Sequence, residues 1–114
     1  MSRAQLRGHA LLKDRASVFA ALGDETRLSL IGKLSKGPPQ SISRLAEGAM
    51  VTRQAITKHL RVLEGAGVAH SVRVGRESLF AFRPEPLKEA RSYLDRVSDQ
   101  WDDTLARLKS FVEN

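Results

Sequence analysis

The sequence contains no cysteine, a single tryptophan and a single tyrosine, and no long apolar run. The lack of cysteine excludes disulfide bonds, thiolate metal ligands and thiol redox sensing. The apolar run at residues 10–12 stops at Lys13, far short of the apolar core of a signal peptide. No stretch approaches the roughly 18 apolar residues of a membrane span. These absences favour a cytoplasmic protein with no membrane contact and a mostly aliphatic core.

The composition that remains is that of one ordinary globular domain. The chain has 114 residues, of which 41% are hydrophobic and 28% are charged. The net charge of +6 is unevenly placed. Residues 1–84 carry fourteen Lys/Arg against six Asp/Glu, a balance of +8, whereas residues 85–114 carry five against seven, a balance of −2. A basic body of this kind favours a polyanionic partner, and the acidic tail favours a separate role such as self-association.

Capping and stop residues divide the first half of the chain into short helices. Residues 1–9 show no periodicity and are interpreted as a flexible basic arm. A helix is expected over residues 10–22, with Gly23 ending it in a left-handed conformation. Asp24 is the expected N-cap of a second helix, whose buried stripe is Leu28, Ile31 and Leu34.

Two further capping residues predict a helix-turn-helix. Ser41 is suited to cap a short helix over residues 42–47, which Gly48 ends. Thr52 is suited to cap a longer helix that runs to about Ala66, with Gly67 as its stop. Two short helices joined by a tight turn form the helix-turn-helix arrangement.

The pattern then changes from helical to alternating. Residues 68–74 and 77–83 alternate apolar and polar side chains on either side of Gly75 and Arg76, which predicts a two-stranded hairpin. Pro84 and Pro86 suit the start of a final helix. The expected fold is mainly α with a small β-hairpin: a winged helix-turn-helix of about five helices and a two-stranded wing. Its expected parts are the arm (1–9), a body (10–84) and a C-terminal dimerisation helix (85–114).

The final helix carries an apolar seam close to a heptad repeat. The seam is formed by Leu87, Ala90, Leu94, Val97, Trp101, Leu105, Leu108 and Val112. A helix of about 28 residues extends roughly 40 Å, which is too long for a body of this size to cover. A partner is therefore expected, and the predicted dimer interface is Leu94, Val97, Trp101, Leu105 and Leu108. Three roles stay open for Trp101: monomer core, dimer anchor or part of a small-molecule pocket.

The helix over residues 52–63 separates two kinds of side chain. Ile56, Leu60 and Leu63 cluster on one side and are expected in the core. The opposite side carries hydrogen-bond donors, namely Gln54, Thr57, Lys58 and Arg61. A helix that reads double-stranded DNA needs this division between an anchored side and a donor side. The plain alternative is a solvated polar face of the kind that most surface helices have.

The donor types suggest specific contacts to DNA. Gln54 can pair with adenine through its amide, and Lys58 or Arg61 with guanine. The arginines of the hairpin can follow the phosphates or enter the minor groove. For His59 a phosphate contact and a packing or capping role stay equally open. The predicted DNA-binding residues are Arg53, Gln54, Thr57, Lys58, His59, Arg61, Arg73 and Arg76.

Four segments together resemble the ArsR-type winged helix-turn-helix repressors. They read LGDETRLSLIGKL (22–34), SISRLA (41–46), VTRQAITKHLRVLEGAGV (51–68) and RVGRESLFAF (73–82). The resemblance covers roughly residues 16–112 without large insertions. It implies a homodimer with the terminal helices at its interface, which binds imperfect palindromic operators and blocks transcription.

The sequence departs from the metal-sensing members of that family. Where those carry paired cysteines, this chain reads ISRLAEGAM, and its terminal helix has aspartates but no histidine. Carboxylates alone make a poor transition-metal site, and the three histidines lack ligand spacing. The chain resembles the metal-independent members, so no metal or other cofactor is expected, and a small-molecule effector stays open.

An enzyme and a protein- or RNA-binding module are the two other classes of function to compare with a DNA-binding regulator. The motifs assemble no Ser-His-Asp arrangement, phosphate-binding glycine loop or thiol, so the chain is not expected to be an enzyme. A winged helix that binds protein or RNA is the remaining alternative, since fold does not dictate function.

Overall fold

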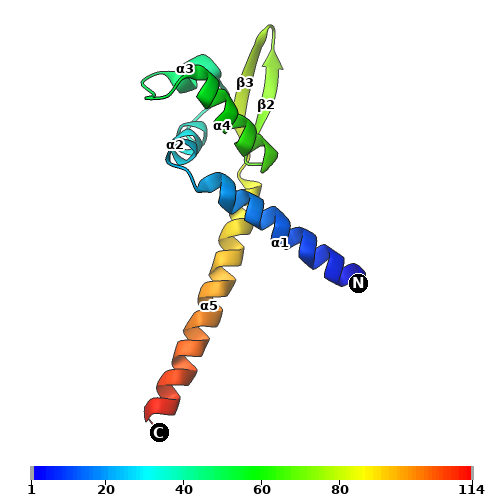
Figure 1. Ribbon diagram of the computed structural model, residues 1–114, viewed down its shortest axis with the longest axis vertical. Coiled ribbons are helices and arrows are strands. Elements are labelled where there is room, and N and C mark those ends of the chain that lie inside the picture. The colour runs from blue at the N-terminus through cyan, green and yellow to red at the C-terminus, as the bar shows by residue number, and fades with distance from the viewer. Residues whose placement is uncertain (1, 114) are drawn as a thin grey trace.

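The computed structural model describes residues 2–113 as five helices and three short strands (Figure 1). In chain order they are α1 (Arg3–Leu22), α2 (Glu25–Leu34), β1 (Gln40–Ser41), α3 (Ile42–Ala46), α4 (Arg53–Gly65), β2 (Ala69–Val74), β3 (Glu77–Phe82) and α5 (Glu85–Glu113). The helix-turn-helix is formed by α3 and α4, and the wing by β2 and β3. The winged helix-turn-helix predicted from the sequence is confirmed.

Three capping predictions are confirmed by backbone hydrogen bonds. The Asp24 side chain accepts from the backbone N–H of Arg27 at 3.0 Å. Ser41 caps α3 and Thr52 caps α4 in the same way, each at 3.1 Å. These bonds satisfy amides that a helix start otherwise leaves without partners. The three caps therefore fix where α2, α3 and α4 begin.

The segment predicted as a flexible basic arm, residues 1–9, is helical from Arg3 onward, and Met1 lies outside the described residues. Arg3 already belongs to α1, because Ser2 and Gln5 form a capping box. The Ser2 hydroxyl accepts from the Gln5 backbone at 3.1 Å, and the Gln5 side chain accepts from the Ser2 backbone at 2.8 Å. This reciprocal cap starts the helix although the apolar periodicity is weak there. At the other end α1 stops before Gly23 as expected, but at φ −79° rather than in the left-handed region.

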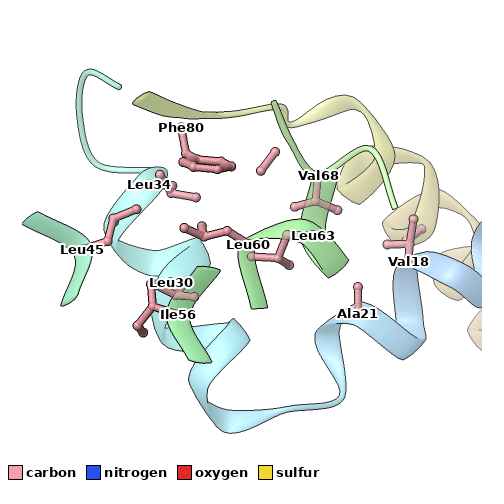
Figure 2. Packing of buried hydrophobic residues seen from close by; sticks show 12 residues of the cluster. Val18, Ala21, Leu30, Leu34, Leu45, Ile56, Leu60, Leu63, Val68 and Phe80 are labelled. Carbon is pink, nitrogen blue, oxygen red and sulfur yellow. The ribbon is translucent and has the colours of Figure 1, made fainter. Parts of the chain in front are cut away.

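The core lies between the helices and the sheet (Figure 2). Phe80 of β3 packs there together with Leu30, Leu34, Leu45, Leu60, Leu63 and Val68, all buried. The stripe predicted for α2 is partly wrong. Leu34 is buried and Ile31 half-buried, but Leu28 is 54% exposed and Leu30 takes the inward position. Leu30 and Leu34 are one turn apart, so the inward side of α2 repeats every four residues and not every three.

The wing belongs to a three-stranded antiparallel sheet with strand order β1-β3-β2. The predicted hairpin is confirmed, with Val74 opposite Glu77 and Gly75 at φ +63° in the turn. Strand β1 was not predicted, since two residues are too short to show alternation. It pairs with β3 through Gln40 and Ser41 and so joins the wing to the start of α3.

Helix α5 leaves the body and gives the molecule its elongated shape (Figure 1). Its first turns pack against the body through Leu87 and the buried Ala90. Tyr93 still meets Phe19 of α1, with ring centres 6.2 Å apart, and the helix beyond it extends away, so that the longest dimension reaches 67 Å. No helix within residues 2–113 combines the length and apolarity needed to cross a membrane.

Candidate nucleic-acid interface

Helix α4 has one buried side and one side open to solvent, as predicted. Ile56, Leu60 and Leu63 are 1%, 0% and 0% exposed. Gln54, Lys58 and Arg61 are exposed on the other side, and Thr57 is half-buried. Since the anchored side is fixed by the core, the direction of the donor side is fixed too. The side chains on this face therefore project at defined positions from a rigid helix.

Two residues near the start of α4 are held within the helix-turn-helix. The Thr57 hydroxyl donates to the carbonyl of Arg53 at 2.9 Å, one turn earlier. The Arg53 guanidinium donates to the Ser43 hydroxyl at 2.6 Å and so connects α4 with α3. A guanidinium has five N–H donors, so Arg53 keeps others free for a second acceptor.

Arg61 is joined to the wing through Glu64. The guanidinium donates to the Glu64 carboxylate at 2.8 Å and lies 5.5 Å from the centre of the Phe80 ring. The second Glu64 oxygen accepts from the backbone and the hydroxyl of Ser71 on β2, at 3.2 and 2.8 Å. The hydrogen bond from Arg61, followed by that from the Ser71 hydroxyl, lowers the pKa of Glu64 below its ordinary value.

Glu64 was not among the residues predicted for the site. Sequence reasoning marks it only as the first acid after the donor face, because its partner Ser71 lies seven residues away on another element. The alternation that predicts β2 places Ser71 on a strand but does not bring it beside α4. Glu64 therefore links α4 to β2 through polar contacts.

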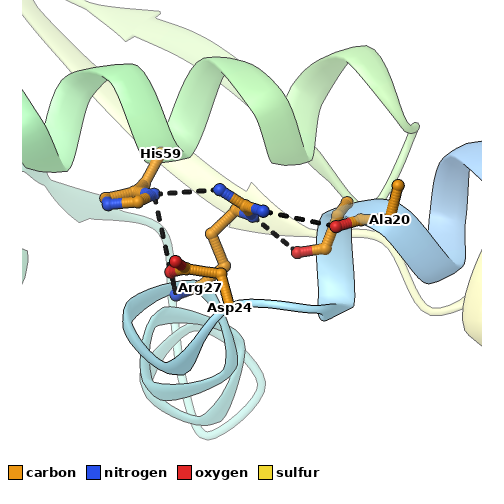
Figure 3. A network of polar contacts seen from close by, with 5 residues as sticks. Ala20, Asp24, Arg27 and His59 are labelled. Atoms are coloured by element: carbon orange, nitrogen blue, oxygen red, sulfur yellow. Dashed lines mark hydrogen bonds and ion pairs between the residues drawn. The ribbon is translucent and has the colours of Figure 1, made fainter.

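His59 points away from the donor face, into a polar network between α4 and α2 (Figure 3). Its Nδ1 lies 3.2 Å from an Arg27 guanidinium nitrogen and 3.7 Å from the Asp24 carboxylate. Arg27 also donates to the carbonyls of Ala20 and Ala21, at 3.2 and 2.6 Å. The packing role considered for His59 fits these contacts, and its phosphate contact stays a prediction.

The same network explains the charge state of Asp24. The backbone N–H of Arg27 donates to its carboxylate, and this bond is the main cause of a pKa below the ordinary value. Desolvation is the next largest effect and opposes this shift, and the positive charge of Arg27 lowers the pKa further. Asp24 thus caps α2 as a carboxylate and at the same time faces α4.

The wing carries exposed arginines near its tip and at its base. Arg73 on β2 and Arg76 in the turn are both exposed. Arg83 follows β3 at the base of the hairpin, where its backbone N–H donates to the carbonyl of Val68 at 2.8 Å. Figure 1 shows that the wing tip is the part of the hairpin farthest from α5.

The predicted dimer residues lie along α5 from Leu94 onward. They are all exposed, namely Leu94, Val97, Trp101, Leu105 and Leu108. Trp101 is 60% exposed, which excludes a place in the monomer core. The N-terminal half of α1 adds Leu6, Leu11 and Leu12, and the end of α5 adds Phe111, which was not predicted. An apolar area of this extent is unusual for a monomer.

Across residues 2–113, no three His, Asp or Glu side chains gather in a way that could hold a metal ion. Of the histidines, His9 lies on α1, His59 on α4 and His70 on β2. The aspartates of α5 are exposed along the helix.

Comparison with known proteins gives matches over most of the chain. The helix-turn-helix domain family matches residues 22–72. The uncharacterized HTH-type transcriptional regulator YuzN of Bacillus subtilis is 38% identical over 81 residues, which cover 66% of this chain and 88% of YuzN.

Solved structures extend the match to the complete fold. An ArsR-like transcriptional regulator from Rhodococcus sp. RHA1 has a TM-score of 0.82 and 42% identity, covering 89% of this chain and 92% of the other. The homodimeric winged helix-turn-helix DNA-binding domain of Mb0332 from Mycobacterium bovis has a TM-score of 0.66. At 23% identity, over 91% of this chain and 93% of the other, it shows likeness of fold alone.

Proposed function

The chain belongs to the ArsR family of DNA-binding HTH-type transcriptional regulators, and we propose that it acts as a homodimeric repressor on a palindromic operator. The observation that carries this proposal is the two-sided α4, whose core side is buried while Gln54, Lys58 and Arg61 face solvent. In this proposal α4 lies in the major groove and these donors contact base edges.

In the same proposal, residues at the start of α4 and on the wing contact the DNA backbone and so position the helix. Arg53 and Thr57 lie near the start of the helix, where phosphate contacts set the register of a recognition helix. Arg73 and Arg76 of the wing bind the flanking phosphates or minor groove. The net charge of +8 over residues 1–84 supports this, because it places the positive balance on the body that faces DNA.

Dimerisation is assigned to α5. Its exposed seam of Leu94, Val97, Trp101, Leu105 and Leu108 needs a cover that the body does not provide. A second copy supplies an identical apolar face, and pairing of this kind presents two recognition helices to the two halves of a palindrome. In this division residues 10–84 bind DNA and residues 85–114 hold the dimer.

We also propose that the dimer represses transcription without sensing a metal. A dimer seated on an operator excludes other proteins from the same stretch of DNA. The chain lacks the cysteines and the helix-borne histidines that the metal-sensing members use. Sensing of a transition metal is therefore not part of this proposal.

The test is a gel-shift titration of the full chain on the DNA upstream of its own gene, followed by footprinting. We expect a protected region with two related half-sites and reduced transcription from that DNA in vitro. A scrambled duplex of the same length is the control. Equal affinity for both duplexes contradicts operator reading, and binding with increased transcription contradicts repression.

A further inference from the structure

A shallow hollow lies between the start of α3 and the first turns of α4, the two helices of the helix-turn-helix (Figure 1). Its volume is about 390 Å³, and it is lined by Ile42, Arg53, Gln54 and Thr57. Three of these residues are among those predicted to bind DNA. Ile42 is not, because its side chain carries neither a hydrogen-bond donor nor a positive charge. The hollow therefore contains one apolar side chain in an otherwise polar lining.

Ile42 is held in place by the fold. It is the first residue of α3, directly after the cap Ser41, and it is half-buried and packed against the core. The part of its side chain that the core does not cover lines the hollow. A side chain anchored in this way loses little further conformational freedom when a ligand contacts it.

The hydroxyl of Thr57 is already committed within the protein. It donates to the carbonyl of Arg53 at 2.9 Å, so its hydrogen is not available to a base. The γ-methyl group of Thr57 remains available for van der Waals contact. Arg53 donates to the Ser43 hydroxyl at 2.6 Å, whereas Gln54 is exposed and its amide can pair with adenine. The hollow thus offers two methyl-bearing side chains beside one amide.

Only one group on the base edges of the major groove matches the apolar part of this lining. The bases present hydrogen-bond donors and acceptors there, and thymine alone adds a methyl group. A donor or acceptor placed against Ile42 loses its water without gaining a partner, which is costly. A methyl group gains free energy by leaving water. The apolar part of the lining therefore favours thymine over the other bases.

The charges around the hollow permit the approach of DNA. The lining contains no acid, and Arg53 gives it a positive charge. The hollow is continuous with the exposed donor side of α4, since Gln54 belongs to both. The hollow between α2 and the turn before α4, of about 340 Å³, includes Glu25, and the one beside the start of α5, of about 520 Å³, includes Glu85. A carboxylate in either place repels the phosphates of a duplex.

We propose that the hollow between α3 and α4 is a thymine subsite, in which Ile42 and the γ-methyl group of Thr57 contact the C5-methyl group of one thymine in each half-site. Gln54 contacts an adjacent base, and Arg53 contacts a neighbouring phosphate with the donors that Ser43 leaves free. Ile42 is then a specificity-determining residue on α3, although α4 carries the donors. This inference rests on the proposed function, because it requires α4 to lie in the major groove.

Replacement of thymine by deoxyuridine tests the subsite directly, because it removes the methyl group and keeps every hydrogen-bonding group of the base. Operator duplexes, each with deoxyuridine at one thymine position of both half-sites, are titrated with the full chain by fluorescence anisotropy. We expect one position at which the replacement weakens binding by about three- to fivefold per half-site, the effect of burying one methyl group. The other positions should change the affinity little.

Variants of the lining test the protein side of the same contact. Ile42→Ala should weaken binding to the thymine operator and abolish the deoxyuridine penalty at the responsive position, since groups in contact are coupled. Ile42→Val and Thr57→Ser each remove one methyl group and should reduce that penalty in part, and they keep the test valid if Ile42→Ala does not fold. Thr104→Ser is the matched control. The Thr104 hydroxyl donates to the carbonyl of Gln100 at 3.0 Å, the same contact as in Thr57 but on α5, so this variant should keep the full penalty.

The subsite is refuted if no thymine position responds to deoxyuridine. It is also refuted if Ile42→Val and Thr57→Ser both keep the full penalty, or if Thr57→Ser and Thr104→Ser reduce it equally. Any of these results with a chain that prefers its operator to a scrambled duplex overturns the subsite and leaves the proposed function intact. Equal affinity for the operator and the scrambled duplex overturns the proposed function, and the subsite with it.

Discussion

The donors on the open face of α4 differ in how much freedom they have before DNA arrives. Gln54 and Lys58 make no hydrogen bond to another side chain or to the backbone within residues 2–113. Arg61 is paired with Glu64, and Arg53 with Ser43. A free donor can turn toward a base without giving up a partner. Gln54 is therefore the residue whose loss most directly reports on base reading.

Glu64→Gln tests the connection between α4 and the wing. The variant keeps an acceptor for Ser71 but loses the charge that attracts Arg61, so we expect a loss of about 0.5–1.5 kcal/mol in the free energy of unfolding. The pKa of Glu64 is lowered in the folded state, so its stabilisation is present above the ordinary value of 4.5 and is lost as the pH falls through the folded pKa.

Chemical unfolding of both proteins from pH 7 down to pH 3 is the measurement. The difference between wild type and Glu64→Gln should shrink below the ordinary Glu pKa of 4.5. A difference that stays constant over this range shows that the charge of Glu64 contributes nothing to stability.

Leu60→Ala tests the anchored side of α4. Leu60 is fully buried among the core residues, so its truncation leaves a cavity and should destabilise the fold by about 2–5 kcal/mol. Val62→Ala on the same helix is the control, since Val62 is half exposed and should cost much less. Urea unfolding followed by circular dichroism gives both values, and similar losses would mean that α4 is not anchored as described.

Residue roles were predictable where they depend on local sequence. The caps Asp24, Ser41 and Thr52 need only a partner three residues ahead, and all three are confirmed. The contacts of His59 and Glu64 were not predictable in this way, because their partners lie on α2 and β2. A helical wheel gives the direction of a side chain but not the element that it meets.

At the scale of elements, the base of the wing is anchored in the core through the buried Ala69 and Phe80, and polar and strand contacts add to this. Glu64 holds β2 to α4, and β1 holds β3 to the start of α3. The tip with Gly75 and Arg76 extends beyond both. This arrangement fixes the base of the hairpin while leaving the tip arginine exposed to an incoming phosphate.

Arg76→Ala tests the role of that tip. If Arg76 contacts phosphate, its loss should weaken binding to operator and to random DNA by a similar factor and reduce the salt slope of log K by about 1. Fluorescence anisotropy at several salt concentrations measures both quantities. Lys109→Ala, near the far end of α5, removes one charge away from the wing and should leave the slope unchanged. An unchanged slope in Arg76→Ala removes the wing tip from the interface.

The elements were predicted where periodicity or a turn signal is strong. Helix α4, the hairpin and α5 match their expected positions within one or two residues. The first turns of α1 were missed, because Ser2 and Gln5 provide a cap without an apolar repeat. Strand β1 was missed, because its two residues acquire strand geometry only by pairing with β3. Both misses concern structure that depends on a specific partner.

At the scale of the whole molecule, the small body leaves much of the extended α5 uncovered, and this favours association with a partner. The axis of 67 Å exceeds the other dimensions of 37 and 22 Å. The apolar side chains of α5 beyond Ala90 stay exposed in the single chain. The cost of leaving this face in water is what drives the proposed pairing of two copies.

Trp101→Asp tests that pairing. A carboxylate in the middle of the seam is costly to bury, so we expect monomers by light scattering and weakened operator binding. Gln100→Asp adds the same charge at the neighbouring position outside the seam and should stay dimeric. A dimeric Trp101→Asp variant with normal operator affinity contradicts the assigned interface.

The central claim is that the open face of α4 reads base pairs, and the operator preference of Gln54→Ala tests it most directly. Dissociation constants of wild type and variant are measured on the operator and on a scrambled duplex at one salt concentration. We predict a loss of about 1–3 kcal/mol on the operator and almost none on the scrambled duplex. An equal loss on both duplexes, or no loss on either, would contradict the account.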